Sequence, residues 1–359
     1  MKRALLYKVL FIAFMLPLFA MANNKDGKYT KKKTINKEFS VNSNATLSVD
    51  NSYGNIDVIT WNENRIVFEI IITTTGNNEE KVQDRLDDIT VEFDGSSNSV
   101  SAKTKFSSRS NSWWNWGRNN NVKMKINYII KIPITNNIDL NNDYGSINVD
   151  KLEGHAKIDC DYGKITTKEL LADNNSISFD YSNNCYFEYI KGGKINADYS
   201  GFTISKTNNL DINADYTSSK IEIAENVKFN CDYGSIAIDK ANNVSGNGDY
   251  LTIKIGNVYK NVSIIADYGA IKIANITANA GNITIKSDYT GIKIGYDQNY
   301  NFNFNIELDY ASLNSEGLEF LRKEVKSRSK YYSGYYGNKN SVNTIKIESD
   351  YGSVSLNKN

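Results

Sequence analysis

The chain has 359 residues, with 42 Lys or Arg against 41 Asp or Glu, so its formal net charge is +1. Because phosphate neutralisation dominates nucleic-acid binding, this balance argues against nucleic acids as partners, and equally against a general polyanion. Only two prolines, Pro17 and Pro133, interrupt a sequence that is 40% hydrophobic, which leaves long stretches free to pair as strands.

The first residues have the pattern of a secretory signal peptide. A basic start precedes an apolar run from Val9 to Ala20, and Ala20 and Ala22 occupy the −3 and −1 positions that signal peptidase reads. The run is about a dozen residues long, whereas a membrane-spanning helix needs about 20. We expect residues 1–22 to be removed after Sec export, with no lipid anchor and no transmembrane segment in the mature chain. The expected location is the periplasm, the outer membrane or the cell exterior.

The next region, residues 23–36, is predicted to be a flexible tail because it is polar and carries the basic run Lys31 to Lys33. Residues 37–135 begin with the degenerate first copy of a repeat, at Tyr53, and continue with an insertion of different pattern. In that insertion we expect strands at 66–75, 89–93, 99–105 and 122–132, and a short helix at 79–86. Stacked strands must cover their open ends, so we interpret the block as an antiparallel β cap.

The loop Ser107 to Asn121 concentrates three of the four tryptophans of the chain. Aromatic side chains beside arginine are typical of glycan or protein contacts. The alternative is that these rings fold back over the cap. The candidate ligand-contact residues in this loop are Trp113, Trp114, Trp116, Arg109 and Arg118.

From residue 136 to 359 one unit is repeated, marked by the pair Asp-Tyr. Successive tyrosines from Tyr144 to Tyr310 lie 18, 19, 18, 17, 17, 17, 18, 21 and 21 residues apart, and another copy contains Tyr351. The residues four places before and three places after the tyrosine are apolar in most copies, as Ile158 and Ile165 are around Tyr162. Each unit therefore predicts two short strands, in which apolar and polar residues alternate, joined by a bend.

Coiling each unit into one rung would let every strand pair with the rungs above and below, about 4.8 Å away. We therefore predict an all-β fold: a right-handed parallel β-solenoid (β-helix) with rungs of about 17–21 residues, preceded by the antiparallel cap with its one short helix. The right hand follows from the handedness of parallel β connections.

Two rows of side chains would follow from such stacking. The repeated aspartates could share a hard cation such as calcium, but we favour hydrogen bonds from backbone N–H groups in Asx-turns. The tyrosines would pack on one another at the bend. An alternative for the exposed tyrosine row is the binding of a sugar or polymer.

Catalytic and redox chemistry find little support in the residue types present. His155 is the one histidine and falls in a turn between rungs, and no constellation for nucleophilic catalysis accompanies it. Cys160 and Cys231 occupy equivalent positions four rungs apart, roughly 20 Å and beyond disulfide reach, so we expect buried free thiols. No catalytic residue, cofactor or metal site is predicted.

A second interruption, at residues 316–343, separates Tyr310 from Tyr351. We expect an amphipathic helix from Glu316 to Lys326 that covers the far end of the solenoid, followed by a surface loop at residues 331–336. Tyr332 and Tyr335 in that loop are further candidate ligand contacts.

The segment from Asn51 to Val58, followed by Trp61, the insertion and the strand that ends at Pro133, resembles the opening of the bacterial putative-adhesin family. The Gly-x-Ile-x-Ile/Val rungs, such as the one from Gly145 to Val149, are similar to that family too. The resemblance extends over nearly the whole mature chain. It implies a β-helical domain of unknown function, common in Bacteroidetes, and brings no catalytic residues.

The sequence thus predicts a non-enzymatic, secreted cell-envelope protein that presents an extended surface, either as an adhesin or as an envelope scaffold. The partner would be a surface ligand, either a glycan or an envelope protein. The alternative function is a polysaccharide-binding or polysaccharide-cleaving β-helix protein, since some β-helical proteins cleave polysaccharides with clustered carboxylates.

Overall fold

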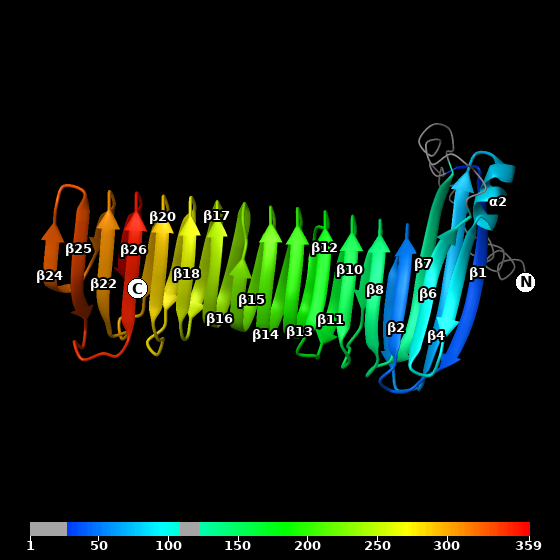
Figure 1. The fold of residues 1–359 in the computed structure, drawn as a ribbon, viewed down its shortest axis with the longest axis horizontal. Helices are drawn as coiled ribbons and strands as arrows, with labels where there is room; N and C mark the ends of the chain where they lie inside the picture. Colours follow the sequence, from blue (N-terminus) through cyan, green and yellow to red (C-terminus); the bar gives the residue numbers. More distant parts are fainter. Residues whose placement is uncertain (1–26, 108–121) are drawn as a thin grey trace, which may run out of the picture.

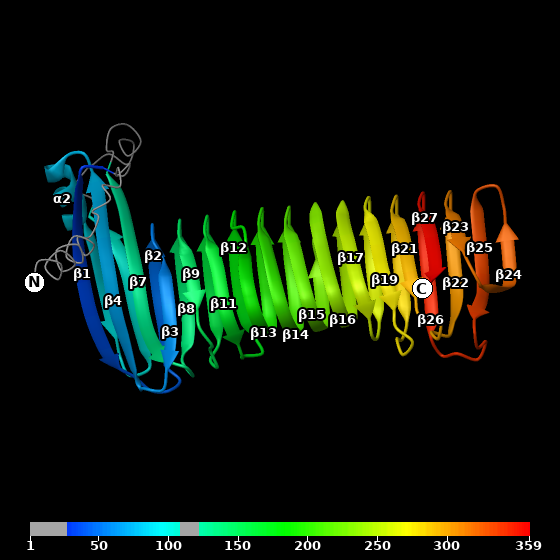
Figure 2. The ribbon, with the colours of Figure 1, turned by 180° about the vertical axis from the view of Figure 1, so that it is seen from behind.

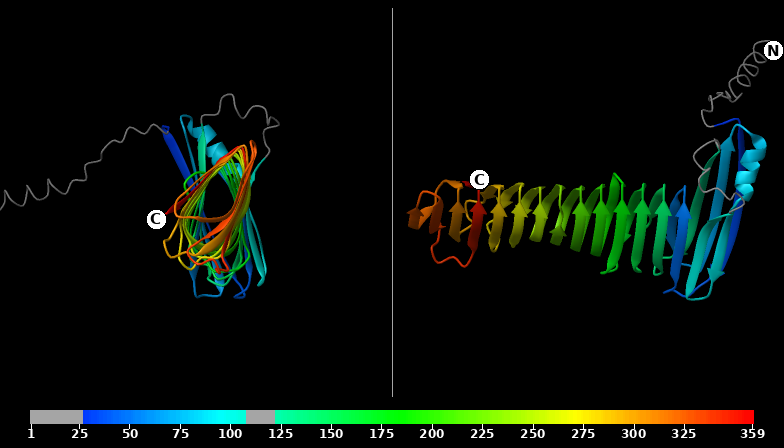
Figure 3. Two further views of the ribbon diagram at one scale, coloured as in Figure 1. Left: turned by 90° about the vertical axis from the view of Figure 1, so that its left-hand side faces the viewer. Right: turned by 45° about the horizontal axis from the view of Figure 1, so that its top comes forward.

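A computed structural model describes residues 27–107 and 122–359. Within these ranges nearly all regular structure is β-strand, and the strands lie side by side along an elongated body (Figures 1 and 2). Viewed down its long axis, the body has a flattened outline (Figure 3). The broader end contains the N-terminal residues that the structure describes.

The broader end is a block of antiparallel strands and one helix. Three long strands form one sheet, in which β4 (Arg65–Gly76) lies between β1 (Tyr29–Ser40) and β7 (Lys123–Pro133). Helix α2 (Glu79–Asp87), β5 (Ile89–Gly95) and β6 (Ser99–Phe106) complete the block, with β5 and β6 antiparallel. The strands and the helix predicted between residues 66 and 132 are confirmed.

The first rung joins this block to the remaining strands. Strand β2 (Thr46–Ser52) is parallel to both β6 and β8 (Asn137–Asp143), and β3 (Ile56–Trp61) is parallel to both β7 and β9 (Ser146–Val149). One hydrophobic core consequently runs from the block into the repeated part without interruption.

The repeated part is a succession of parallel strands in register. Ile158, for example, lies opposite Leu140 on one side and Ile177 on the other, and all three side chains are buried. Because the period is two, these side chains point inward while their neighbours face solvent. Beyond β9 the strands are β10 (Ala156–Asp161), β11 (Lys164–Leu170), β12 (Asn175–Asp180), β13 (Cys185–Asp198), β14 (Gly201–Asp215), β15 (Ser218–Asn230), β16 (Gly234–Asp249), β17 (Leu251–Val258), β18 (Val262–Asp267), β19 (Ala270–Ile276), β20 (Ile283–Asp288), β21 (Gly291–Tyr296), β22 (Phe302–Asp309) and β23 (Ser312–Ser315).

The last unit of the chain does not stack in sequence order. Strand β26 (Thr344–Asp350) lies between β20 and β22, and β27 (Ser353–Lys358) lies between β21 and β23. The red C-terminal strands thus separate yellow from orange ones in Figure 1. After β21 the chain leaves one position of the stack open and forms β22 and β23 beyond it. The last two strands, β26 and β27, then return and fill that position.

The predicted flexible tail at residues 23–36 is wrong from Tyr29 onward, since these residues belong to β1. All twelve residues of β1 pair with β4, from Tyr29 opposite Gly76 to Ser40 opposite Arg65. A strand edge offers backbone hydrogen bonds whatever the side chains are, so the polar and basic composition did not prevent pairing.

The predicted helix at 316–326 and the predicted surface loop at 331–336 are also wrong. They form an antiparallel pair of strands, β24 (Glu319–Val325) and β25 (Ser329–Tyr336), in which β25 also pairs with β22. Backbone hydrogen bonds from β22 to β25, and from β25 to β24, stabilise the strands. They outweigh the preference of these residues for a helix. Gly334 permits the close packing, because a Cβ there would lie 1.9 Å from the Glu319 carbonyl oxygen.

Candidate functional site

Tyrosines lie one above another along one edge of the stack, at the bend within each rung. Neighbouring rings are stacked, with centroids 4.7–5.2 Å apart and planes inclined by at most 12°. At the usual strand spacing the set is roughly 50 Å long. We call it the tyrosine row, and in spatial order it consists of Tyr53, Tyr144, Tyr162, Tyr181, Tyr199, Tyr216, Tyr233, Tyr250, Tyr268, Tyr289, Tyr351 and Tyr310.

Every tyrosine of the row has a left-handed backbone, with φ between 49° and 63°. For a residue with a Cβ this conformation costs on the order of 1 kcal/mol. A stacked aromatic pair contributes about 0.5–1.5 kcal/mol beyond its buried area, and each interior ring has two neighbours, so stacking offsets the strain. The backbone N–H is satisfied as well: that of Tyr216 donates to the Asp232 carbonyl at 2.9 Å.

The rings of the row cover one another's faces and leave their edges and hydroxyls exposed. From Tyr144 onward each tyrosine of the row is 46–53% exposed. A sugar ring cannot lie flat on a face that another tyrosine already occupies. A ligand instead meets a line of phenol edges and hydroxyls, each able to donate and accept a hydrogen bond, which suits a long molecule lying along the row.

A row of aspartates runs beside the tyrosines, and its carboxylates bond to the backbone. In six places Oδ1 of one rung accepts from the backbone N–H of the aspartate in the next rung, at 2.8–3.1 Å. The prediction of backbone donors is confirmed, but the donor comes from the adjacent rung rather than from an Asx-turn. The bonded pairs are Asp161 with Asp180, Asp180 with Asp198, Asp198 with Asp215, Asp215 with Asp232, Asp232 with Asp249, and Asp267 with Asp288.

Several of these carboxyl groups are harder to ionise than usual. Partial burial is the main cause that raises the pKa of Asp143, Asp180 and Asp350, and neighbouring carboxylates raise it further. For Asp180 the N–H of Asp198 acts in the opposite direction. Among the described residues no group of three or more His, Cys, Asp or Glu side chains is arranged to hold a metal ion.

Sequence reasoning missed a third row, formed by hydroxyls directly after some tyrosines. Ser182 Oγ accepts from the Gly163 N–H at 3.0 Å and donates to the Cys160 carbonyl at 3.0 Å. Ser200 Oγ and Thr217 Oγ1 act in the same way on the rungs that follow. The signal was visible in the copies that have Asp-Tyr-Ser or Asp-Tyr-Thr in place of Asp-Tyr-Gly, because a hydroxyl can satisfy the amide of the adjacent bend.

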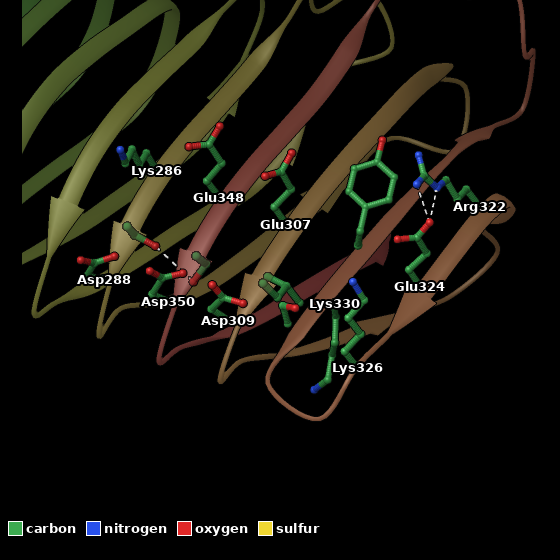
Figure 4. A pocket seen from close by; sticks show the side chains of 15 residues that line it. Lys286, Asp288, Glu307, Asp309, Arg322, Glu324, Lys326, Lys330, Glu348 and Asp350 are labelled. Carbon is green, nitrogen blue, oxygen red and sulfur yellow. Dashed lines mark hydrogen bonds and ion pairs between the residues drawn. The ribbon is translucent and has the colours of Figure 1, made fainter.

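A second candidate site is a cavity of about 510 Å³ at the C-terminal end, which we call the terminal cavity (Figure 4). Glu307 and Glu348 lie opposite each other on adjacent strands, and Arg322 donates to Glu324 at 2.7 Å. A hydrogen bond from Lys346 lowers the pKa of Glu348. The charged side chains that line the cavity are Lys286, Asp288, Glu307, Asp309, Arg322, Glu324, Lys326, Lys330, Glu348 and Asp350.

Of the sequence-predicted contact residues, the structure describes Tyr332 and Tyr335. Trp113, Trp114, Trp116, Arg109 and Arg118 lie outside the described residues. Tyr332 is only 8% exposed and packs edge-on against Phe320, so it belongs to the core rather than to a contact surface. Tyr335 is partly exposed on β25.

The histidine and the three cysteines lie in surroundings that explain them by structure rather than by chemistry. The His155 Nε2 lies 2.9 Å from the Asn174 carbonyl oxygen in a turn between rungs. Cys160, Cys185 and Cys231 are buried free thiols, as predicted for the first and third. Across the described ranges, the structure contains no helix of the length and hydropathy that membrane crossing requires.

No family model matches the chain, and no curated protein resembles it closely enough in sequence to count as a relative. Solved structures that are similar to it include three bacterial proteins. A putative adhesin from Parabacteroides distasonis ATCC 8503 is 12% identical with a TM-score of 0.29, over 74% of this chain and 93% of that chain. A putative adhesin from Bacteroides fragilis NCTC 9343 is 11% identical with a TM-score of 0.22, over 91% and 97%. A putative cell adhesion protein from Clostridium sporogenes ATCC 15579 is 12% identical with a TM-score of 0.19, over 92% and 100%. These names agree with the resemblance found in the sequence, but such a distant likeness carries no argument about function.

Proposed function

We propose that the chain is an exported, non-enzymatic protein of the cell envelope, a right-handed parallel β-solenoid that presents the tyrosine row as a contact surface. The partner is a surface glycan or an envelope protein, and the role is that of an adhesin or scaffold. In this proposal residues 1–22 direct export, and the N-terminal block covers the end of the solenoid.

The tyrosine row is the single observation that carries the proposal. Packing alone requires the rings to stack, but it does not require a hydroxyl on each of them, because phenylalanine would stack equally well. The retained hydroxyls form a line along one edge, with neighbouring rings about 5 Å apart. A surface of this length engages many repeats of a polymer at once, and weak contacts then add up through multivalency.

Binding of glycans and isolated envelope fractions to the mature protein tests the proposal. The test variant changes Tyr216, Tyr233 and Tyr250 to Phe, which keeps three consecutive rings stacked and removes their hydroxyls. The matched control changes Tyr186, Tyr189 and Tyr259 to Phe, outside the row. We expect binding to weaken in the row variant alone. Equal binding by both variants would contradict the proposal.

A second candidate function, polysaccharide cleavage, is favoured by one property of the terminal cavity. Glu348 and Asp350 face the same side of β26, and their pKa values are displaced in opposite directions, down for Glu348 and up for Asp350. Such divergence is typical of a base and an acid that act together. Chain cleavage that disappears in Glu348→Gln would establish this function and overturn the non-enzymatic one.

A further inference from the structure

A cavity of about 520 Å³ lies where the tyrosine row begins, against the strands of the N-terminal block. Tyr53 and Tyr144, the first two rings of the row, form one side of it. Lys32 on β1, Thr73 on β4 and Lys125 on β7 form another side. We call this space the lysine cavity.

Strand register places two of its lysines on either side of one threonine. Lys32 lies opposite Thr73, and Thr73 lies opposite Lys125 on its other side. Residues directly opposite on paired strands point to the same face, so the two ammonium groups share a face, with Thr73 between them. At a strand spacing of about 4.8 Å, their backbones are roughly 10 Å apart, and the flexible stems can converge on one group.

No acid balances this charge among the described residues. The described lining of the cavity contains no Asp or Glu, and within the same part of the chain no ion pair joins Lys32 or Lys125 to a carboxylate. The adjacent Lys31 shows the contrast, because its side chain is on the other face of β1 and contacts Glu79 at 2.6 Å. Two lysines that face one cavity without a counter-charge favour an anion between them.

We infer that the lysine cavity binds a carboxylate of an acidic glycan at the start of the tyrosine row. The inference rests on the proposed function and narrows its ligand from any surface polymer to a glycan with acidic groups. Lys32 and Lys125 provide the charge, and the hydroxyls of Thr73 and Tyr144 provide hydrogen bonds to neighbouring sugar hydroxyls. The net charge of +1 does not exclude such a site, because it is a sum over the whole chain and carries no information on local clusters.

Calorimetric titration of the mature protein with trigalacturonate, polygalacturonate and the neutral glucan laminarin tests the inference. The site variant combines Lys32→Gln with Lys125→Gln. The matched control combines Lys254→Gln with Lys272→Gln, two exposed lysines that lie opposite each other on β17 and β19. We expect the site variant to bind both acidic ligands about tenfold more weakly. The control variant should stay within about twofold, since it loses only distant, screened charge. A third variant, Lys32→Arg with Lys125→Arg, should retain binding.

The outcomes separate this inference from the proposal on which it rests. Polygalacturonate binding that depends on the row tyrosines but not on Lys32 and Lys125 would overturn the inference and leave the proposed function standing. Trigalacturonate binding that depends on the lysines, with no gain for the longer polymer, would support the site and count against the row as a polymer surface. Absence of binding to both acidic ligands would overturn the inference, as would equal losses in the site and control variants.

Discussion

Tyr289 stacks on Tyr351, near the end of the chain, and not on Tyr310, the next tyrosine of the repeat. The ring centroids of Tyr289 and Tyr351 lie 4.7 Å apart, and Tyr351 stacks in turn on Tyr310 at 4.8 Å. The inserted rung therefore continues the tyrosine row without a gap. It also places the C-terminal strands inside the stack, with a neighbour on each side.

Removing residues 344–359 should loosen the end of the stack by leaving β20 and β22 without their shared neighbour. The backbone N–H of Tyr289 donates to the Asp350 carbonyl at 2.8 Å, so we expect hydrogen exchange at Tyr289 to become much faster in the truncated chain. Removal of residues 358–359 alone is the control and should leave that exchange slow. Unchanged protection of Tyr289 after the larger truncation would mean that β22 can close the gap, contrary to this prediction.

Substitutions at Tyr216 separate stacking from backbone strain. Tyr216→Phe keeps both stacked neighbours and should change the free energy of unfolding by less than about 0.5 kcal/mol. Tyr216→Ala loses two stacked pairs and keeps the left-handed strain, so we expect a loss of about 1–3 kcal/mol. Tyr216→Gly loses the same pairs without the strain and should be less damaging than Ala by on the order of 1 kcal/mol. Urea denaturation measures all three, and equal losses for Ala and Gly would contradict the role given to strain.

Asp180→Asn should stabilise the protein at neutral pH. Because the pKa of Asp180 is raised on folding, the folded state holds this proton more tightly than the unfolded chain does. The stability linked to the group therefore decreases as pH rises from the ordinary value of 3.8 through the raised one. Asparagine resembles the protonated acid and can still accept from the Asp198 N–H. We expect a higher unfolding temperature than wild type at neutral pH and no difference below about pH 3.5.

The exposed Asp211, outside the row, provides the control for this experiment. Asp211→Asn removes one exposed carboxylate outside the row and should leave the unfolding temperature at neutral pH as it is in wild type. A lower unfolding temperature for Asp180→Asn at neutral pH would show that the charge of this carboxylate stabilises the fold.

The three cysteines should be inert in the native protein. Burial raises the pKa of Cys160 to about 12, that of Cys185 to about 11 and that of Cys231 to about 12, and only the thiolate is nucleophilic. We expect iodoacetamide at pH 8 to leave the folded chain unmodified and to alkylate all three thiols in urea, as measured by mass spectrometry. Rapid alkylation of any one thiol before unfolding would contradict its buried position.

The repeat pattern predicted the strands well because each inward position is apolar in most copies, as at Ile158 and Ile177. It did not predict the inserted rung, because the interval between Tyr310 and Tyr351 is equally compatible with stacking in sequence order. Glu319 to Val325 has helix-forming residues, and its strand structure depends on an edge supplied by distant residues. The lysine cavity was equally hidden, since Lys32 and Lys125 become neighbours of Thr73 only when β1, β4 and β7 pair.

The in-register stacking of equivalent positions is tested most directly by cross-linking exposed lysines replaced by cysteine. Lys254 lies directly opposite Lys272, and Lys272 lies opposite Lys293 one strand further. Adjacent strands are about 4.8 Å apart, within the reach of a disulfide, whereas alternate strands are roughly 10 Å apart and beyond it. Mild oxidation should close an intramolecular disulfide in the variant with Lys254→Cys and Lys272→Cys, and none in the variant with Lys254→Cys and Lys293→Cys. A bond in the second variant, or none in the first, would contradict the stacking on which the tyrosine row depends.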